Sequence, residues 1–72
     1  MSNKIFVITN FQGIVSFYAD LEKAKNELKN IHDTTHDFKH YSYEINVYIL
    51  IDNTYINTDE KYIYYLDNFI QK

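Results

Sequence analysis

Three histidines at a regular spacing are the part of the sequence most suited to chemistry. In the stretch HDTTHDFKH, His32, His36 and His40 recur every four residues, with aspartates and threonines between them. Imidazole binds metals such as zinc and changes its charge near neutral pH, so the row indicates a metal site or a pH-responsive site. On a helix, residues four apart lie about 6 Å apart along the axis, and residues eight apart lie about 12 Å apart. A single ion can therefore reach two of these histidines but not all three.

The same histidines also fit the solvated end of a helix that runs into a loop. The stretch Asp33-Thr34-Thr35 is a poor helix former, because short polar side chains compete for backbone hydrogen bonds. We therefore expect the helix to end between Ile31 and Asp33, and the next strand to begin after His40. The sequence assigns no metal or cofactor, and the three histidines stay as weak candidates for a metal site.

The polar residues of the sequence show no pattern typical of a catalytic site. The chain contains no cysteine, and none of its serines, Ser2, Ser16 and Ser42, lies in a G-x-S-x-G elbow. A single glycine cannot form a phosphate-binding loop. The neighbouring carboxylates Asp59 and Glu60 are more typical of a helix N-terminus than of an acid–base pair. We predict that the protein is not an enzyme.

The run KIFVITNFQGIVSFYADLEKAKNELKNI resembles the start of the GIY-YIG endonucleases, in which a hairpin with an I-T-N segment precedes a helix. The family's two triplets would fall on Lys4-Ile5-Phe6 and Val15-Ser16-Phe17, and its helix arginine on lysine or asparagine, so the tyrosines and the arginine are missing. The same run is similar to small ββαβ proteins of phages and bacteria. This second resemblance implies a fold and no activity.

Charge and composition argue against nucleic-acid and membrane binding. Ten acidic residues against seven lysines give a net charge of −3, and arginine is absent, so the basic groups that contact phosphates and bases are few. The N-terminal run is too short and too polar for a secretory signal, and no stretch approaches the about 18 apolar residues of a membrane span. We expect a cytoplasmic protein. The abundant Ile, Asn, Lys, Tyr and Phe have AT-rich codons, which favours an AT-rich genome such as that of a virus, a phage or a low-GC bacterium, and the host cytoplasm if the source is viral.

Local patterns predict a hairpin followed by a helix. The β-branched and aromatic segments Lys4–Thr9 and Gly13–Tyr18 flank the only glycine, which suits a tight turn. Asp20 fits a helix N-cap, and apolar residues then recur at helical spacing, which predicts a helix over residues 20–32. The members of this apolar stripe are Leu21, Ala24, Leu28 and Ile31.

The C-terminal half begins with a strand and ends ambiguously. Apolar and polar residues alternate over Tyr43–Ile51, which predicts a long strand, and Asp52-Asn53 is a turn signal before a short fourth strand at Thr54–Asn57. Thr58 followed by two acidic residues is typical of a helix start, and the apolar residues beyond it match a helical spacing. The stretch Tyr62–Tyr65 also has high β-propensity. We favour a C-terminal helix, with a strand as the alternative.

These elements predict an α+β fold that forms a single compact domain over residues 1–72. The expected order is ββαβ(β): a small antiparallel-type sheet of three to four strands, one helix packed on a face, and a C-terminal helix. The core beneath the first helix is expected to contain Phe6, Ile8, Val15, Phe17, Ile45, Val47 and Ile49. The opposite face is expected to carry Ile5, Val7, Ile14, Tyr18, Tyr48 and Leu50.

This opposite face is too apolar for an isolated monomer to leave in water, so either the C-terminal helix or a second chain must cover it. A chain of 72 residues buries only about 60% of its unfolded surface, which adds to the need for a partner. We predict a non-catalytic protein–protein interaction module that self-associates, as a homodimer, or binds a larger cellular or host protein. The alternative is a metal- or pH-responsive module that uses the histidines. The candidate interaction surface consists of Ile5, Val7, Tyr18, Tyr48, Leu50, Tyr55, Tyr62 and Tyr65.

Overall fold

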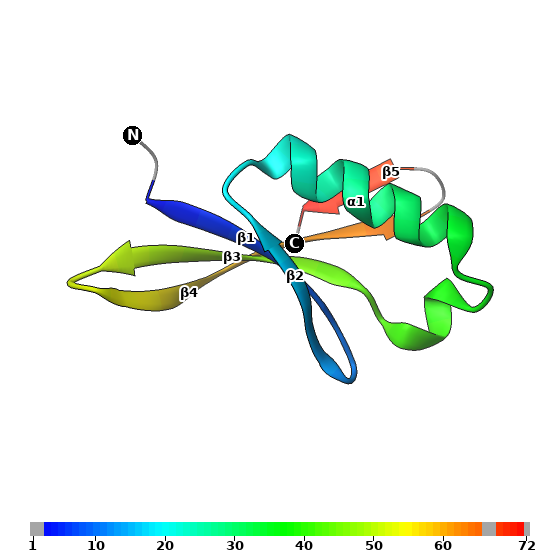
Figure 1. Cartoon of the computed structure of the whole chain (residues 1–72), viewed down its shortest axis with the longest axis horizontal. Helices are drawn as coiled ribbons and strands as arrows, with labels where there is room; N and C mark the ends of the chain where they lie inside the picture. The colour runs from blue at the N-terminus through cyan, green and yellow to red at the C-terminus, as the bar shows by residue number, and fades with distance from the viewer. Residues whose placement is uncertain (1–2, 66–67, 72) are drawn as a thin grey trace.

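The protein folds as one five-stranded antiparallel sheet with a helix across one face. The structure, a computed structural model, describes residues 3–65 and 68–71. Its strands pair in the order β2-β1-β3-β4-β5. Figure 1 shows α1 lying along one side of the sheet, and α1 is the only α-helix within the described residues. The elements are β1 (Lys4–Asn10), β2 (Gly13–Tyr18), α1 (Leu21–Thr34), the 3-10 turn η1 (Phe38–Tyr41), β3 (Glu44–Ile51), β4 (Thr54–Tyr65) and β5 (Asn68–Gln71).

The predicted N-terminal hairpin is confirmed, but its second strand contains a bulge. Gly13 closes the turn with a φ of 128°, a backbone conformation open to glycine and strained for other residues. Ile8 pairs with Ser16 whereas Thr9 pairs with Ile14, so Val15 is an extra residue in β2. This bulge places Ser16 on the side of the sheet that faces α1.

The bulge corrects two of the predicted core positions. Val15 is 44% exposed and Phe17 is 68% exposed, so neither belongs to the core. Strict alternation along β2 predicts that Val15 and Phe17 face the helix, but the extra residue shifts the pattern by one position. Phe17 pairs with Val7 and therefore lies on the face opposite α1.

The predicted first helix is confirmed. It ends at Thr34, two residues later than the predicted end at residue 32. The Asp20 side chain accepts a hydrogen bond from the backbone N–H of Glu22 at 2.9 Å, which satisfies a donor that the first turn leaves free. At the other end, the Thr34 hydroxyl donates to the carbonyl of Asn30 at 2.8 Å. The helix thus includes Asp33 and Thr34 because this hydroxyl bonds within the helix instead of competing with it.

The predicted C-terminal helix is wrong, and with it the predicted number of strands. The chain forms a second hairpin at Asp52-Asn53, whose φ values of 50° and 63° match a two-residue turn between antiparallel strands. β4 then continues to Tyr65 and pairs with β5. Within residues 3–65 and 68–71, the α+β fold therefore has five strands and one α-helix, instead of three to four strands and two helices.

Local chemistry at Thr58 explains why the helix signal misled. The Thr58 hydroxyl accepts the backbone N–H of Glu60 at 3.2 Å, which resembles a helix N-cap, but it also donates to the carbonyl of Val47 on β3 at 2.9 Å. Asp59 adopts a positive φ of 67° and interrupts the ladder. The capping residues therefore form a bulge between two halves of one strand.

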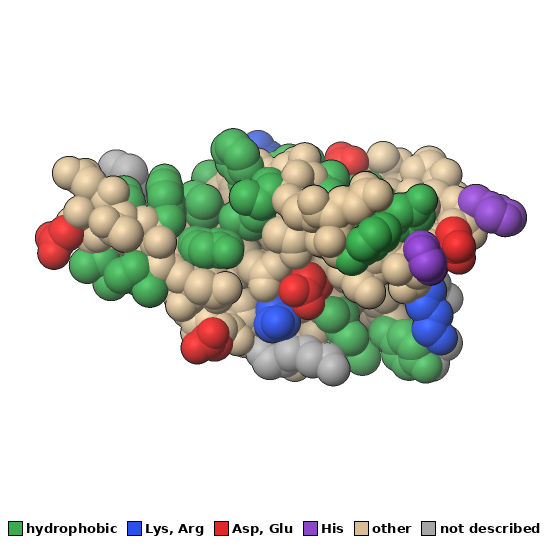
Figure 2. Space-filling model, turned by 90° about the horizontal axis from the view of Figure 1, so that it is seen from below, with side chains coloured by type: hydrophobic (Ala, Val, Ile, Leu, Met, Phe, Trp, Pro, Cys, Tyr) green, Lys and Arg blue, Asp and Glu red, His purple; other side chains and the backbone are tan. Residues whose placement is uncertain are grey.

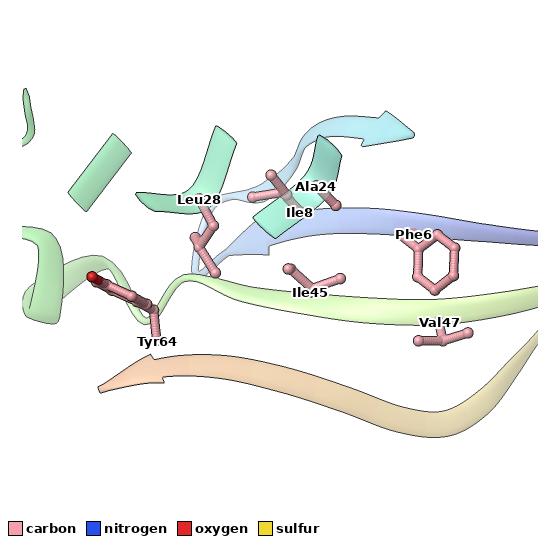
Figure 3. Close-up of a cluster of buried hydrophobic side chains, with 7 residues drawn as sticks. All are labelled: Phe6, Ile8, Ala24, Leu28, Ile45, Val47 and Tyr64. Atoms are coloured by element: carbon pink, nitrogen blue, oxygen red, sulfur yellow. The ribbon is translucent and has the colours of Figure 1, made fainter. Parts of the chain in front are cut away.

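The core lies between α1 and the sheet (Figure 3). Ala24 and Leu28 of the helix are fully buried against the central strands, and Tyr64 is buried at the end of β4. Within the described residues, the helix is too short and too polar to cross a membrane. The core cluster consists of Phe6, Ile8, Ala24, Leu28, Ile45, Val47 and Tyr64.

Candidate interaction surface

The sheet face opposite α1, here called the open face, is built by strand register. Val7 pairs with Phe17 on one side, so these side chains point in the same direction. Ile5 pairs with Tyr48, and Leu50 pairs with Tyr55, in the same manner. The apolar members of the open face are Ile5 and Val7 of β1, Ile14 and Phe17 of β2, Tyr48 and Leu50 of β3, and Tyr55 of β4.

An apolar groove runs over this face. It encloses about 520 Å³, which lies in the range typical of binding sites. Val7 lies in it at only 4% exposure, while Ile14 and Phe17 are 69% and 68% exposed and Tyr55 is 52% exposed. Figure 2, seen from below the sheet, shows hydrophobic side chains gathered in groups across this side of the molecule. The residues lining the groove are Ile5, Val7, Ile14, Phe17, Tyr18, Ala19, Tyr48 and Tyr55.

Polar side chains border the apolar part of the open face. Asn46, only 7% exposed, donates from Nδ2 to the Thr9 hydroxyl at 2.8 Å. Lys61 Nζ lies 3.7 Å from Glu44 Oε1. These groups bond to one another, and the lining of the groove includes no charged side chain. An apolar centre with a polar border is the composition of a typical protein interface.

The structure brings together most of the residues predicted for the interaction surface. Ile5, Val7, Tyr48 and Tyr55 line the groove, and Leu50 shares their face. Tyr18 lines the groove at its edge and also packs against the core.

The other two predicted tyrosines lie outside the groove. Tyr62 packs on the helix side, where Lys25 Nζ lies 5.4 Å from the centre of its ring. Burial raises the pKa of Tyr62 above its ordinary value of 10.0, and the negative charge of Glu60 raises it further. Tyr65 borders a separate cavity near the end of α1.

Ile14, Phe17 and Ala19 also line the groove, although the candidate interaction surface predicted from the sequence does not include them. The sequence predicts that Ile14 lies on this face of the sheet and that Phe17 lies in the core. The signal that places Phe17 here is the bulge at Val15, which alternation along the strand does not reveal. The exposure of Ile14 and Phe17 makes them the most protruding apolar side chains beside the groove.

The cavity near the end of α1 encloses about 420 Å³ and is lined mainly by aromatic rings. The ring of His32 lies 4.9 Å from that of Phe38 and 4.8 Å from that of Tyr64, both edge to face. Its Nδ1 atom lies 3.1 Å from the Asp33 carboxylate. His32 therefore packs as a member of an aromatic cluster at the end of the helix.

The three histidines are not gathered into one site. His40 contacts Phe11 and Tyr41, with ring centres 5.7 Å and 5.5 Å apart, on the side of the β1–β2 turn. His36 lies in the exposed segment between α1 and η1. Across residues 3–65 and 68–71, no group of three histidine or acidic side chains is placed to hold a metal ion.

Comparisons with protein families, with curated proteins and with solved structures find no match to this chain. The arrangement of the open face is thus the principal guide to its function.

Proposed function

We propose that the chain is a non-catalytic protein-interaction module that binds a protein partner through the open face. The observation that supports this proposal is the apolar groove around Val7, bordered by Ile14, Phe17 and Tyr55 at more than half exposure. Soluble monomers rarely leave a contiguous apolar surface of this kind in water, and such surfaces are typical of interaction sites. Tyrosine and phenylalanine are also enriched at interfaces because they provide large, stiff contact areas.

Two neighbouring residues on β4 provide a matched test. Tyr55 lies on the open face and is 52% exposed, whereas Ile56 pairs with Ile49 on the helix side of the sheet and is 45% exposed. Lysine at either position adds the same charge to the same strand at a similar exposure. Only Tyr55→Lys places that charge at the groove.

The experiment immobilises tagged wild type, Tyr55→Lys and Ile56→Lys, and exposes them to a lysate of the source organism mixed with untagged chain. We expect at least one protein, which can be the untagged chain itself, to be retained by wild type and Ile56→Lys. Retention by Tyr55→Lys should fall about tenfold, corresponding to roughly 1.4 kcal/mol of binding free energy. Equal retention of the same proteins by all three forms would contradict the proposal.

A further inference from the structure

We infer that the partner of the open face is a second copy of this chain, packed face to face across a two-fold axis. This inference rests on the proposed function and specifies its partner. The first support is the amount of exposed surface. The chain exposes 5199 Å², whereas a folded monomer of 8.7 kDa is expected to expose roughly 4,700 Å².

The second support is that the described part of the chain has no segment left to cover this face. A C-terminal helix could have packed there, but residues 54–65 and 68–71 form β4 and β5 within the sheet. The only α-helix among the described residues lies on the other side, where it buries Ala24 and Leu28. No described segment of the chain therefore covers this face.

The third support is the size of the face. Seen from below, the molecule measures 40 Å by 19 Å, so its outline lies within a rectangle of about 760 Å². A standard stable interface buries about 800 Å² on each partner. A contact between two copies that covers most of this side therefore approaches the standard size, with the two sheets stacked about 10 Å apart as in sandwich folds.

The fourth support is that one patch carries both a ridge and a groove. A two-fold interface uses the same patch twice, so the patch must be complementary to itself. Ile14 and Phe17 on β2 form an exposed ridge along the wall of the groove, which also contains Val7 at 4% exposure. With a two-fold axis through the face, the ridge of each copy enters the groove of the other.

Charge permits this approach, whereas pairing through the edge of the sheet is disfavoured. The groove lining is uncharged, and the Lys61–Glu44 ion pair at the border is neutral as a pair. The outer edge of β2 contains the bulge at Val15, a feature that weakens pairing between strand edges of two molecules. At the β2 edge, face-to-face packing is thus favoured over an extended sheet.

The test is sedimentation equilibrium of the untagged chain alone, from about 1 to about 200 µM, a range that brackets micromolar affinity. We expect a mass that approaches twice 8.7 kDa as the concentration rises. Tyr55→Lys and Phe17→Lys, on separate strands, should each weaken dimerisation about tenfold or more, and Ile56→Lys should leave it unchanged. Far-UV circular dichroism verifies that each variant is folded.

Two results would overturn the inference. One is a wild-type chain that stays monomeric over the whole range, and the other is a dimer that persists in both folded open-face variants. A monomeric wild type that still captures a different protein through Tyr55 refutes the second copy alone. A monomeric wild type with no Tyr55-dependent capture refutes the proposed function as well.

Discussion

Removal of the Ser16 hydroxyl and removal of the Thr9 hydroxyl should change the stability of the fold in opposite directions. Ser16 Oγ is buried on the helix side and has no hydrogen-bond partner among the described residues. The Thr9 hydroxyl accepts the Nδ2 hydrogen bond of Asn46 at 2.8 Å, and Asn46 is only 7% exposed. We predict that Ser16→Ala stabilises the fold and that Thr9→Val destabilises it.

The magnitudes follow from the hydrogen bonds. Burying an unpaired hydroxyl costs about 1–3 kcal/mol, and alanine removes that cost at Ser16 while losing a few tenths of a kcal/mol of strand propensity. The net gain in the free energy of unfolding should be about 1 kcal/mol. Valine has nearly the shape of threonine, but it leaves the Asn46 amide without its acceptor, which should cost about 1–2 kcal/mol.

Urea unfolding followed by circular dichroism, at one fixed protein concentration, measures both effects. With a slope of about 1 kcal/mol per molar urea, the midpoint should rise by about 1 M in Ser16→Ala and fall by about 1–2 M in Thr9→Val. The fixed concentration matters because association would make the apparent stability depend on it. A lower midpoint in Ser16→Ala, or no change in Thr9→Val, would refute the hydrogen-bond assignment.

Three further predictions test the turn, the core and the ionisation of a tyrosine. Asn53→Gly should raise the melting temperature by about 2–4 °C, because Asn53 has a φ of 63° that glycine adopts without strain; a lower melting temperature in a thermal scan would count against the turn geometry. Leu28→Ala should lower the free energy of unfolding by about 2–5 kcal/mol, because Leu28 is fully buried; a loss below about 1 kcal/mol by urea titration would mean that α1 does not pack as described. The raised pKa of Tyr62 should make stability fall as pH rises above 10.0, since the unfolded chain then releases a proton that the folded chain retains. In Tyr62→Phe that part of the decline should disappear, and an unchanged decline would contradict the assignment.

Local signals in the sequence are sufficient for both hairpin turns and for the start of the helix. Gly13 marks the first turn, Asp20 caps the helix, and Asp52-Asn53 forms the second turn, because each depends on the conformation of one or two residues. Such preferences act over a few neighbouring positions and do not require knowledge of the tertiary structure.

Where the sequence misled, a long-range contact decided the outcome. Thr58 has the side chain of a helix cap, but its bond to the Val47 carbonyl holds it in a sheet. The extra residue Val15 reverses which side chains of β2 face the helix, and so moves Phe17 from the expected core to the open face. A bulge depends on the pairing of two strands, so alternation within one strand does not reveal it.

The central claim, that the open face is the binding surface, is tested most directly by methyl NMR of isoleucine and valine side chains. Spectra are compared on dilution from about 500 to about 10 µM, a range across which micromolar association is lost, and on addition of any captured partner. The account predicts shifts for Ile5, Val7 and Ile14 on the open face, and none for Ile51 and Ile56. Shifts confined to Ile51 and Ile56, or no shifts while binding is seen by another method, would contradict it.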